Sequence, residues 1–390
     1  MNLHAANAAL PRFASVETLI AALKPIEPVY VLLPERFHLA ARRFIDSFPG
    51  DTLYAVKANP APHVLDLVHA AGINHFDTAS LGEIELVRGR YPDAICHFMA
   101  PVRLPGTAKI AFEQYQVTDF VVDCDFELDK LLAETKSGKG CRIFVRIATP
   151  LGGAVLELSS KFGTTPDDAA RLLKRVAEAG ANPALTFHVG SQCLSPFSYA
   201  QAIEMARRTA ALAGVDIAAL DIGGGFPWSY PGHDVPPYHW YFDTIREALA
   251  TMPDAERLPL LCEPGRGLVA EGMSLVTQVV LRKGDKLYIN DGIYGSFDEL
   301  TLPGWTTDYR LRVFALDRQG GVSAKADRSS AFRVYGPTCD TLDVLPRPLI
   351  LPETIAPGDF IVFDEIGAYS CAVRTAFNGF LPDRWAIVGN

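Results

Sequence analysis

The chain lacks the features of several protein classes. No apolar run approaches the ~20 residues of a membrane-spanning helix, and residues 1–13 lack the basic and apolar segments of a signal peptide. Seven cysteines stand singly with no CxxC pair, so we expect no metal site and reduced thiols. A net charge of −9 without a basic stripe argues against nucleic-acid binding. These absences predict a cytoplasmic protein that binds neither membrane nor nucleic acid.

Length and patterning predict two domains, because 390 residues exceed one ordinary core. From about residue 27 to 260, short apolar runs alternate with helical patterns, which indicates a parallel sheet and fits a (β/α)8 barrel. A doubly wound sheet would carry glycines after its first strand. Here the first predicted strand, residues 28–33, runs into Leu33 and Pro34, and the glycines come late.

Beyond about residue 265, strand-like runs follow one another without helices, which predicts a separate β domain. No Gly- or Ser-rich linker separates the two parts, so we expect them to pack closely. The predicted division is an N-terminal segment (1–27) packed on the C-terminal domain, a barrel (28–264) and a β domain (265–390).

Lys57 occupies an unusual position for a charged side chain. It stands between the apolar residues 53–56 and a turn at residues 58–60. Burial lowers the pKa of an ammonium group toward a neutral, nucleophilic amine. Such an amine can form a Schiff base with an aldehyde cofactor such as pyridoxal phosphate. The alternative is a strand-end lysine whose amine extends into solvent, and Lys57 alone does not decide between them.

A glycine-rich turn follows a late apolar run, where residues 221–227 read DIGGGFP. Gly223, Gly224 and Gly225 lack a Cβ, so their N–H groups can approach an anion closely, as phosphate binding requires. Phosphate sites in barrels favour the loops after late strands. The spacing is not the GxGxxG of dinucleotide sites, and a tight turn without a ligand is the alternative.

Two more strand ends carry polar residues. Glu263 begins the run EPGRG, and a carboxylate at the carboxyl end of a barrel strand could hold a protonated ring nitrogen, with Arg266 near a phosphate. His188 begins the run HVGSQC, where an imidazole could stack on a ring and Ser191 could reach a phosphate oxygen. A structural ion pair and an ordinary polar strand end are the respective alternatives.

The β region adds two motifs. Residues 335–340 read YGPTCD, so the thiol of Cys339 could donate a proton and the carboxylate of Asp340 could hold an amine. A buried cysteine beside a turn aspartate is the alternative. Residues 367–369 read GAY, a weaker signal because a tyrosine after two small residues is common in cores.

In this order the motifs resemble the fold-type III pyridoxal-phosphate decarboxylases, and within them the ornithine decarboxylase branch. The resemblance covers about residues 28–380. It implies an alanine racemase-like barrel that binds pyridoxal phosphate, a C-terminal β-sandwich or barrel, and a head-to-tail homodimer with active sites at the interface. Further similar motifs are FDTAS (76–80) with Glu83, VRI (145–147), KFG (161–163), NDGIYGSF (290–297) and FNGF (377–380).

The resemblance implies a role for each residue. Lys57 resembles the Schiff-base lysine, His188 the ring-stacking histidine and Glu263 the partner of the pyridine nitrogen. Asp77 and Arg146 resemble residues around the lysine and the ring. Cys339 resembles the residue, supplied by the second subunit, that protonates the carbanion. The phosphate-binding set would be Ser191, Gly223, Gly224, Gly225, Arg266 and Tyr369, with Gly265 as a further cofactor-binding residue. The substrate contacts would be Asp340, Cys339, Tyr294 and Asp298.

Two positions depart from the ornithine decarboxylase pattern. In that branch an aspartate after the GSF motif holds the substrate's distal amine, and an ungapped comparison puts Pro303 there. A distal ammonium with one carboxylate fewer would bind less well, unless Asp298, Glu299 or Asp308 substitutes. Alternatively, the far end of the substrate differs from that of ornithine. Gln192 also stands where a glycine is usual in that branch, a departure that resembles some diaminopimelate decarboxylases.

The sequence therefore predicts pyridoxal-phosphate-dependent decarboxylation of ornithine or lysine to a diamine, as in polyamine biosynthesis. Diaminopimelate or a modified diamino acid is an alternative substrate, but residues 300–305 offer no cation for the distal carboxylate of diaminopimelate. A racemase needs a second base facing the lysine, and Cys339 fits a decarboxylase better. A non-catalytic regulatory homologue should have lost Lys57, Glu263 or the glycine run, and all are present.

Overall fold

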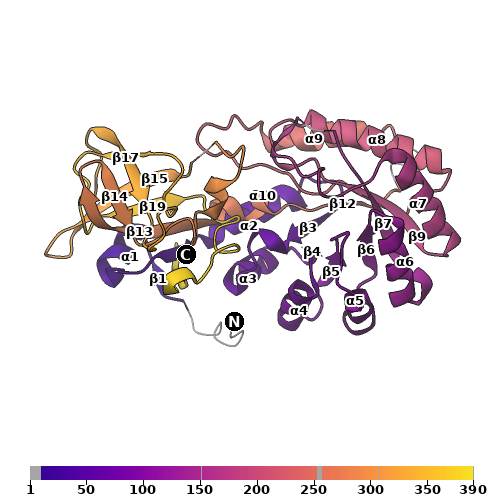
Figure 1. Cartoon of the computed structure of the whole chain (residues 1–390), viewed down its shortest axis with the longest axis horizontal. Coiled ribbons are helices and arrows are strands. Elements are labelled where there is room, and N and C mark those ends of the chain that lie inside the picture. Colours follow the sequence, from indigo (N-terminus) through magenta and orange to yellow (C-terminus); the bar gives the residue numbers. More distant parts are fainter. Residues whose placement is uncertain (1–9, 151, 253–256, 307, 390) are drawn as a thin grey trace.

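The computed structural model describes residues 10–150, 152–252, 257–306 and 308–389. It has a barrel at one end and a curled sheet at the other, with α2 (Pro34–Ile45), α3 (Pro62–Ala70) and α10 (Arg266–Val269) between them (Figure 1). Among the described residues, no helix is long and apolar enough to cross a membrane.

The barrel consists of eight parallel strands, as predicted, and the last strand pairs with the first to close it. The helices that follow the strands cover its outside (Figure 1). Local sequence explains their starts, since Ser80 and Thr165 cap two helices through their side chains and prolines occupy the first turns of others. The strands in barrel order are β3 (Asp51–Ala55), β4 (His75–Thr78), β5 (Ile95–Phe98), β6 (Asp119–Val122), β7 (Arg142–Ile147), β9 (Asn182–Phe187), β11 (Leu220–Asp221) and β12 (Leu260–Cys262). The covering helices are α3, α4 (Leu81–Arg90), α5 (Thr107–Tyr115), α6 (Asp125–Glu134), α7 (Pro166–Glu178), α8 (Phe197–Ala213) and α9 (Tyr238–Leu249).

The second sheet is built from both ends of the chain. Its long strand β13 (Met273–Lys283) pairs with β2 (Val29–Leu32), β14 (Lys286–Ile289) and β19 (Phe360–Asp364). The N-terminal strand β1 (Arg12–Phe13) pairs with the C-terminal β20 (Arg384–Val388), and α1 (Val16–Leu23) contacts the same sheet. The remaining strands are β15 (Arg310–Leu316), β16 (Val322–Ala324), β17 (Ser329–Tyr335) and β18 (Leu349–Pro352). The predicted fold class, a barrel followed by a β domain, is thereby confirmed, although β1 and β2 also belong to the sheet.

One strand was misassigned from the sequence. Residues 28–33 are predicted to open the barrel, but β2 lies between β13 and β20 in the other sheet. All four residues of β2 are buried. Since both faces of such a strand are covered, its apolar pattern equals that of a parallel barrel strand, and only the pairing distinguishes the two.

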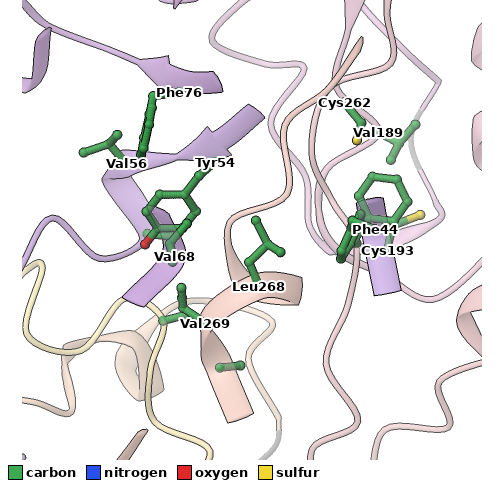
Figure 2. Packing of buried hydrophobic residues seen from close by; sticks show 14 of the residues in the cluster. Phe44, Tyr54, Val56, Val68, Phe76, Val189, Cys193, Cys262, Leu268 and Val269 are labelled. Carbon is green, nitrogen blue, oxygen red and sulfur yellow. The ribbon is translucent and has the colours of Figure 1, made fainter. Parts of the chain in front are cut away.

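Apolar side chains fill the barrel and join it to the helices that lie between the barrel and the sheet. Inside the barrel, seven buried residues form a separate cluster: Leu53, Met99, Val121, Phe144, Ala184, Ala219 and Leu261. Outside it, a larger core links β3, β4 and α10, and Figure 2 shows Tyr54, Val56, Phe76, Leu268 and Val269 in this core. The segment before Lys57 is therefore held on a rigid base.

Candidate active site

Polar side chains form a layer above the apolar interior of the barrel. Side chains alternate along a strand, so a residue two positions beyond an interior residue lies on the same side. The residues two positions beyond Phe144, Ala184, Ala219 and Leu261 are Arg146, Thr186, Asp221 and Glu263. The sequence thus places a cation, a hydroxyl and two carboxyl groups at the carboxyl ends of four strands, where barrel enzymes have their active sites.

Lys57 lies in the short 3-10 helix η2 (Val56–Ala58) directly after β3. Its Nζ donates a hydrogen bond to Oδ2 of Asp77 on β4, at 2.7 Å. Val56 and Ala58 are fully buried, whereas 42% of the Lys57 side chain is exposed. The Lys57 side chain is therefore partly accessible at the carboxyl end of the barrel, whereas its two neighbours belong to the packed core.

The pKa of Lys57 corrects one expectation. Burial lowers this pKa, as the sequence suggested, but the carboxylates of Asp77 and Glu263 outweigh burial, with a further contribution from Tyr369. The net result is a pKa above the ordinary value for lysine. Lys57 is thus an ion-paired ammonium in this structure, because the fold places it next to two acids.

Glu263 and Asp221 are two buried carboxyl groups that interact. Burial first, and then Asp221 and Asp77, raise the pKa of Glu263 well above its ordinary value, although Lys57 and Arg146 oppose this. Burial also raises the pKa of Asp221, to about 6, against hydrogen bonds from Thr186 and the N–H of Gly223. Two adjacent acids in a closed site favour one shared proton.

Asp221 was not among the predicted site residues. Its Oδ1 accepts from the Gly223 N–H at 3.0 Å, and the Gly223 carbonyl accepts from the Glu263 N–H at 2.8 Å. Asp221 therefore connects the glycine run to Glu263. The signal in the sequence was its place at the start of DIGGGFP, at the end of a buried strand.

His188 lies beside the glycine run. Burial, and then Arg146 and Lys57, lower its pKa well below the ordinary value, so its imidazole is neutral at neutral pH. Its Nδ1 accepts a hydrogen bond from the Gly190 N–H at 3.0 Å. A Cβ on Gly224 would come within 3.0 Å of His188 Nε2 and 2.7 Å of the Glu263 carbonyl oxygen. The backbone can approach both residues only because position 224 is glycine.

The remaining residues predicted to bind the cofactor or its phosphate lie near Lys57 and the glycine run. Tyr369 donates its backbone N–H to the carbonyl of Ala58, at 2.8 Å, which brings the GAY motif next to Lys57. A Cβ on Gly265 would lie 2.7 Å from that of Ala58. The strand β10 (Ser191–Cys193) is tied to the glycine run, because the Cys193 N–H donates to the Gly225 carbonyl at 2.8 Å.

Arg266 contacts Glu299. From the sequence, Glu299 was only a possible replacement for the missing carboxylate at the substrate's distal amine. The Nη1 of Arg266 donates to Glu299 and to the hydroxyl of Tyr230, both at 3.0 Å, and its Nη2 donates to the second oxygen of Glu299. Its guanidinium carbon lies 4.7 Å from the ring centre of Trp305 and 5.0 Å from that of Tyr369. Its buried Nε has no hydrogen-bond partner among the described residues.

Three of the four predicted substrate residues, Cys339, Asp340 and Tyr294, lie elsewhere, whereas Asp298 precedes Glu299, the partner of Arg266. Cys339 is exposed, and its N–H donates to the side chain of Asn378, at 3.0 Å. The Tyr294 hydroxyl donates to the carboxylate of Asp340. Within the described part of the chain, no hydrogen bond, ion pair or ring contact joins Cys339, Asp340 or Tyr294 to the residues around Lys57.

Comparison with known proteins agrees with this geometry. The sequence model for the "Pyridoxal-dependent decarboxylase, pyridoxal binding domain" matches residues 33–270. The chain belongs to the pyridoxal-dependent decarboxylase family. It is 34% identical, over 373 residues, to a lysine/ornithine decarboxylase of Selenomonas ruminantium, and this match covers 93% of the chain and 87% of the relative.

Two solved structures of decarboxylases have the same fold. The lysine/ornithine decarboxylase of Vibrio vulnificus complexed with cadaverine has a TM-score of 0.81 and 28% identity, covering 97% of this chain and 100% of that one. The arginine decarboxylase of Paramecium bursaria Chlorella virus bound to agmatine has a TM-score of 0.81 and 25% identity, covering 96% and 98%.

The cofactor of the family is pyridoxal phosphate, and the residues of this decarboxylase fit it. The site has an accessible lysine amine in the barrel mouth, a buried carboxyl on Glu263 and a neutral imidazole on His188. It also has closely packed glycines and the unpartnered Nε of Arg266. These groups match an aldehyde, a ring nitrogen, an aromatic face and a phosphate, respectively.

Proposed function

We propose that this decarboxylase converts ornithine or lysine to the corresponding diamine, as a step in polyamine synthesis. The observation that carries the proposal is the joint placement of Lys57, Glu263 and His188 around one opening, in a chain 34% identical to a lysine/ornithine decarboxylase. The cadaverine complex of the similar Vibrio vulnificus enzyme supports a diamine product.

Pyridoxal phosphate, when bound, supplies the electron sink for the electrons of the bond to CO2. Lys57 would hold it through its amine, and Glu263 would hold the ring nitrogen through a proton. His188 would cover the ring as a neutral imidazole. We assign the phosphate to Arg266 and to the residues Ser191, Gly223, Gly224, Gly225, Gly265 and Tyr369, with Asp77 and Arg146 as neighbours of Lys57 and the ring.

We assign the distal ammonium of the substrate to Asp298, by elimination. Glu299 is occupied by Arg266, and the carboxylate of Asp308 accepts hydrogen bonds from Arg347, at 2.9 and 3.3 Å. Asp298 begins the 3-10 helix η5 (Asp298–Thr301), and burial raises its pKa. Folding partly desolvates the Asp298 carboxylate, and among the described residues no cation pairs with it, so it gains most from a bound ammonium.

We further propose a head-to-tail homodimer in which Cys339, Asp340 and Tyr294 complete the site of the second subunit. Cys339 would return a proton to the α-carbon, and Asp340 would bind the distal amine from the side opposite Asp298, as the second of two carboxylates. Large apolar side chains are exposed around Cys339, namely Leu342 (67%), Phe377 (40%) and Phe380 (45%). Others are exposed at the barrel mouth, namely Val102 (59%), Leu104 (77%) and Phe126 (75%). In a two-fold dimer, the surface around Cys339 of one subunit would pack on the barrel-mouth surface of the other. The same contact would form a second time with the subunits exchanged.

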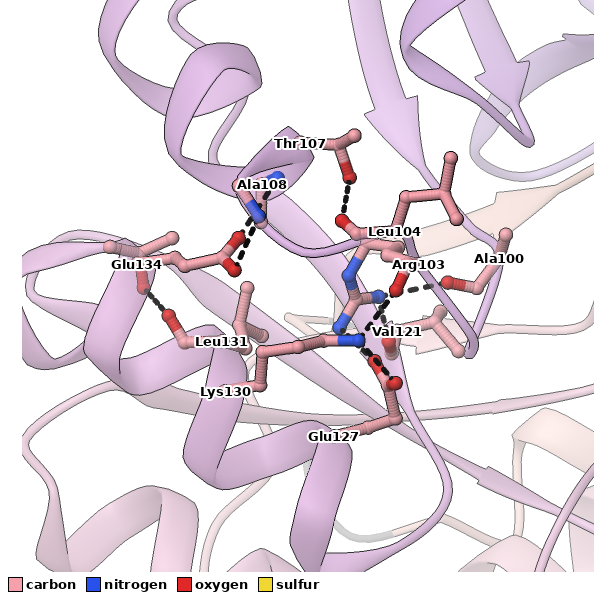
Figure 3. Close-up of polar contacts among 12 residues, drawn as sticks. Ala100, Arg103, Leu104, Thr107, Ala108, Val121, Glu127, Lys130, Leu131 and Glu134 are labelled. Atoms are coloured by element: carbon pink, nitrogen blue, oxygen red, sulfur yellow. Dashed lines mark hydrogen bonds and ion pairs between the residues drawn. The ribbon is translucent and has the colours of Figure 1, made fainter.

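The barrel-mouth surface is held in a fixed shape. Arg103, whose side chain is fully buried, donates to the carbonyls of Ala100 and Val121, and Lys130 donates to its carbonyl at 2.6 Å (Figure 3). Glu127 on α6 pairs with both cations (Figure 3). The loop is thus pinned while Val102 and Leu104 point outward, which suits a preformed contact surface.

We also propose the division into an N-terminal segment, a barrel and a β domain. The barrel, predicted at 28–264, does not include β2, because β2 pairs in the other sheet. A cytoplasmic location also remains a prediction from the sequence.

The test measures CO2 release by the purified, pyridoxal-phosphate-loaded protein from ornithine, lysine, arginine and diaminopimelate. We expect turnover of ornithine or lysine, and we expect Lys57→Ala to abolish it. Turnover of neither, with the cofactor bound, would refute the substrate assignment. Failure to bind the cofactor at Lys57, read from the visible absorption of the protein and from a borohydride-fixed adduct, would refute the catalytic assignment itself.

A further inference from the structure

Gln192 forms a two-point contact with the backbone of the loop that follows the glycine run. Its Oε1 accepts from the Trp228 N–H at 3.0 Å, and its Nε2 donates to the Trp228 carbonyl at 2.5 Å. Gln192 is 1% exposed. The side-chain amide of Gln192 thus pairs with both backbone groups of residue 228, as the backbone of a neighbouring strand would.

The backbone of Gln192 has an unfavourable conformation that a glycine would adopt without strain. Its φ is +55°, in the left-handed region that favours glycine. A glycine, the residue usual here in the ornithine decarboxylase branch, would avoid the strain. Non-glycine residues persist in this conformation where the surroundings over-determine it, often at functional sites.

The contact continues from Gln192 toward the substrate side. Its Nε2 lies 3.2 Å from Nδ1 of His233. Burial and then Arg266 lower the pKa of His233, so a neutral imidazole can accept this hydrogen bond. The His233 ring meets Trp305 edge to face, with ring centres 6.0 Å apart, and Trp305 lies over Arg266.

Trp305 anchors the loop in which this chain departs from the ornithine decarboxylase pattern. Its N–H donates to the Leu302 carbonyl at 3.0 Å, which closes a turn over Pro303 and Gly304. Trp305 is 4% exposed, whereas Pro303 and Gly304 are exposed. The turn directly follows η5, which carries Asp298. The two departures, at Gln192 and at Pro303, are therefore joined by a chain of contacts.

We propose that Gln192 is a positioning residue for substrate selection: through Trp228 and His233 it fixes Trp305, and thereby the turn at Pro303 that borders the substrate's distal end. This inference rests on the proposed function, because it assigns the turn to the distal end of a diamino acid. Among the described residues, the side chain of Gln192 bonds to Trp228 and His233 and not to Lys57.

The first test is the mobility of the turn in the cofactor-loaded protein. Gln192→Gly removes the clasp and keeps a permissive backbone. The matched control is Gln116→Gly, because Gln116 has a φ of +59° at the end of α5, is exposed and bonds no partner through its side chain within the described residues. We expect at least threefold faster hydrogen–deuterium exchange at residues 302–306 in Gln192→Gly and no change in the control. Equal exchange in both would overturn the proposal, whatever the activity.

The second test is selectivity. We expect the ratio of kcat/KM for lysine to that for ornithine to change at least threefold in Gln192→Gly, and in the same direction in His233→Ala, with the ratio of Gln116→Gly unchanged. His233 is only partly buried, so its variant keeps the test valid if Gln192→Gly does not fold. An unchanged ratio alongside faster exchange would overturn the role in selection. A wild type that is inactive on both diamino acids would refute the proposed function instead, and the exchange data would still decide whether Gln192 positions the turn.

Discussion

Glu299 forms a buried two-point ion pair with Arg266, and each side chain is at most 3% exposed. Glu299 comes from η5 on the proposed substrate side, and Arg266 directly follows the Glu263-Pro264-Gly265 turn. The pair therefore ties the substrate side of the site to its cofactor side. Tyr230, Trp305 and Tyr369 surround the guanidinium, which excludes water from the pair.

Removal of one partner of this pair should be costly. We expect Glu299→Ala to lower the free energy of unfolding by about 3–5 kcal/mol, because it leaves a buried guanidinium without its counter-ion. The control is Glu204→Ala, which breaks the exposed pairs with Arg207 and Arg208 and should cost about 1 kcal/mol or less. Urea unfolding of both variants measures the difference, and equal losses would contradict the buried-pair interpretation.

Asp77 should control the protonation of Lys57. Its carboxylate is the largest of the influences that raise the pKa of Lys57. We expect Asp77→Asn to lower that pKa, because it removes the opposite charge next to the ammonium group. Competitive acetylation of the cofactor-free protein at a series of pH values, read by mass spectrometry, gives the midpoint for Lys57. Asp66→Asn is the control, since Asp66 pairs with Arg90, and equal midpoints in both variants would contradict the prediction.

Shared sites should be visible by subunit mixing. Lys57→Ala and Cys339→Ala are each expected to be inactive or nearly so. If Cys339 acts in the second subunit, random exchange makes half of the dimers mixed, each with one intact site, so activity should recover to about one quarter of wild type. A mixture of Lys57→Ala with Glu263→Gln is the control, because both residues belong to one barrel and no intact site can form. Recovery in neither mixture would argue for sites within one subunit.

Asp119 lies at the amino end of the barrel and should make the free energy of unfolding depend on pH. Its carboxylate accepts from His97 at 2.7 Å and from Arg142 at 2.9 Å. Burial raises its pKa, but these two hydrogen bonds and charges outweigh burial and lower the pKa to about 2. A lowered acid pKa stabilises the fold above the unfolded value of about 3.8, and this is lost as pH falls toward 2.

We therefore expect Asp119→Asn to be less stable than wild type by roughly 2 kcal/mol at pH 7 and pH 5, with a smaller difference at pH 3. Urea unfolding at the three values tests this. Asp93→Asn, an exposed neighbour, should follow wild type throughout. A difference between Asp119→Asn and wild type that does not change with pH would contradict the assigned cause.

Several features followed from the sequence alone because they depend on local pattern. Alternating apolar runs and helices indicate a parallel sheet, and the late position of the glycines favours a barrel over a doubly wound sheet. The strand ends then place Lys57, His188 and Glu263 at one rim, because the carboxyl ends of all barrel strands meet there. The glycine run was identifiable as an anion-binding turn, because three glycines after a buried strand leave the backbone N–H groups open to a close ligand.

Other features were decided only by the tertiary structure, because they depend on which distant groups meet. The pairing of β2 with β13 moved one strand out of the barrel, and the proximity of Asp77 and Glu263 reversed the expected pKa shift of Lys57. The ion pair of Glu299 with Arg266 lies 33 residues apart in sequence, and the clasp of Gln192 on Trp228 spans 36. Local pattern determines the elements and their ends, whereas burial and charge act between side chains that only the folded chain brings together.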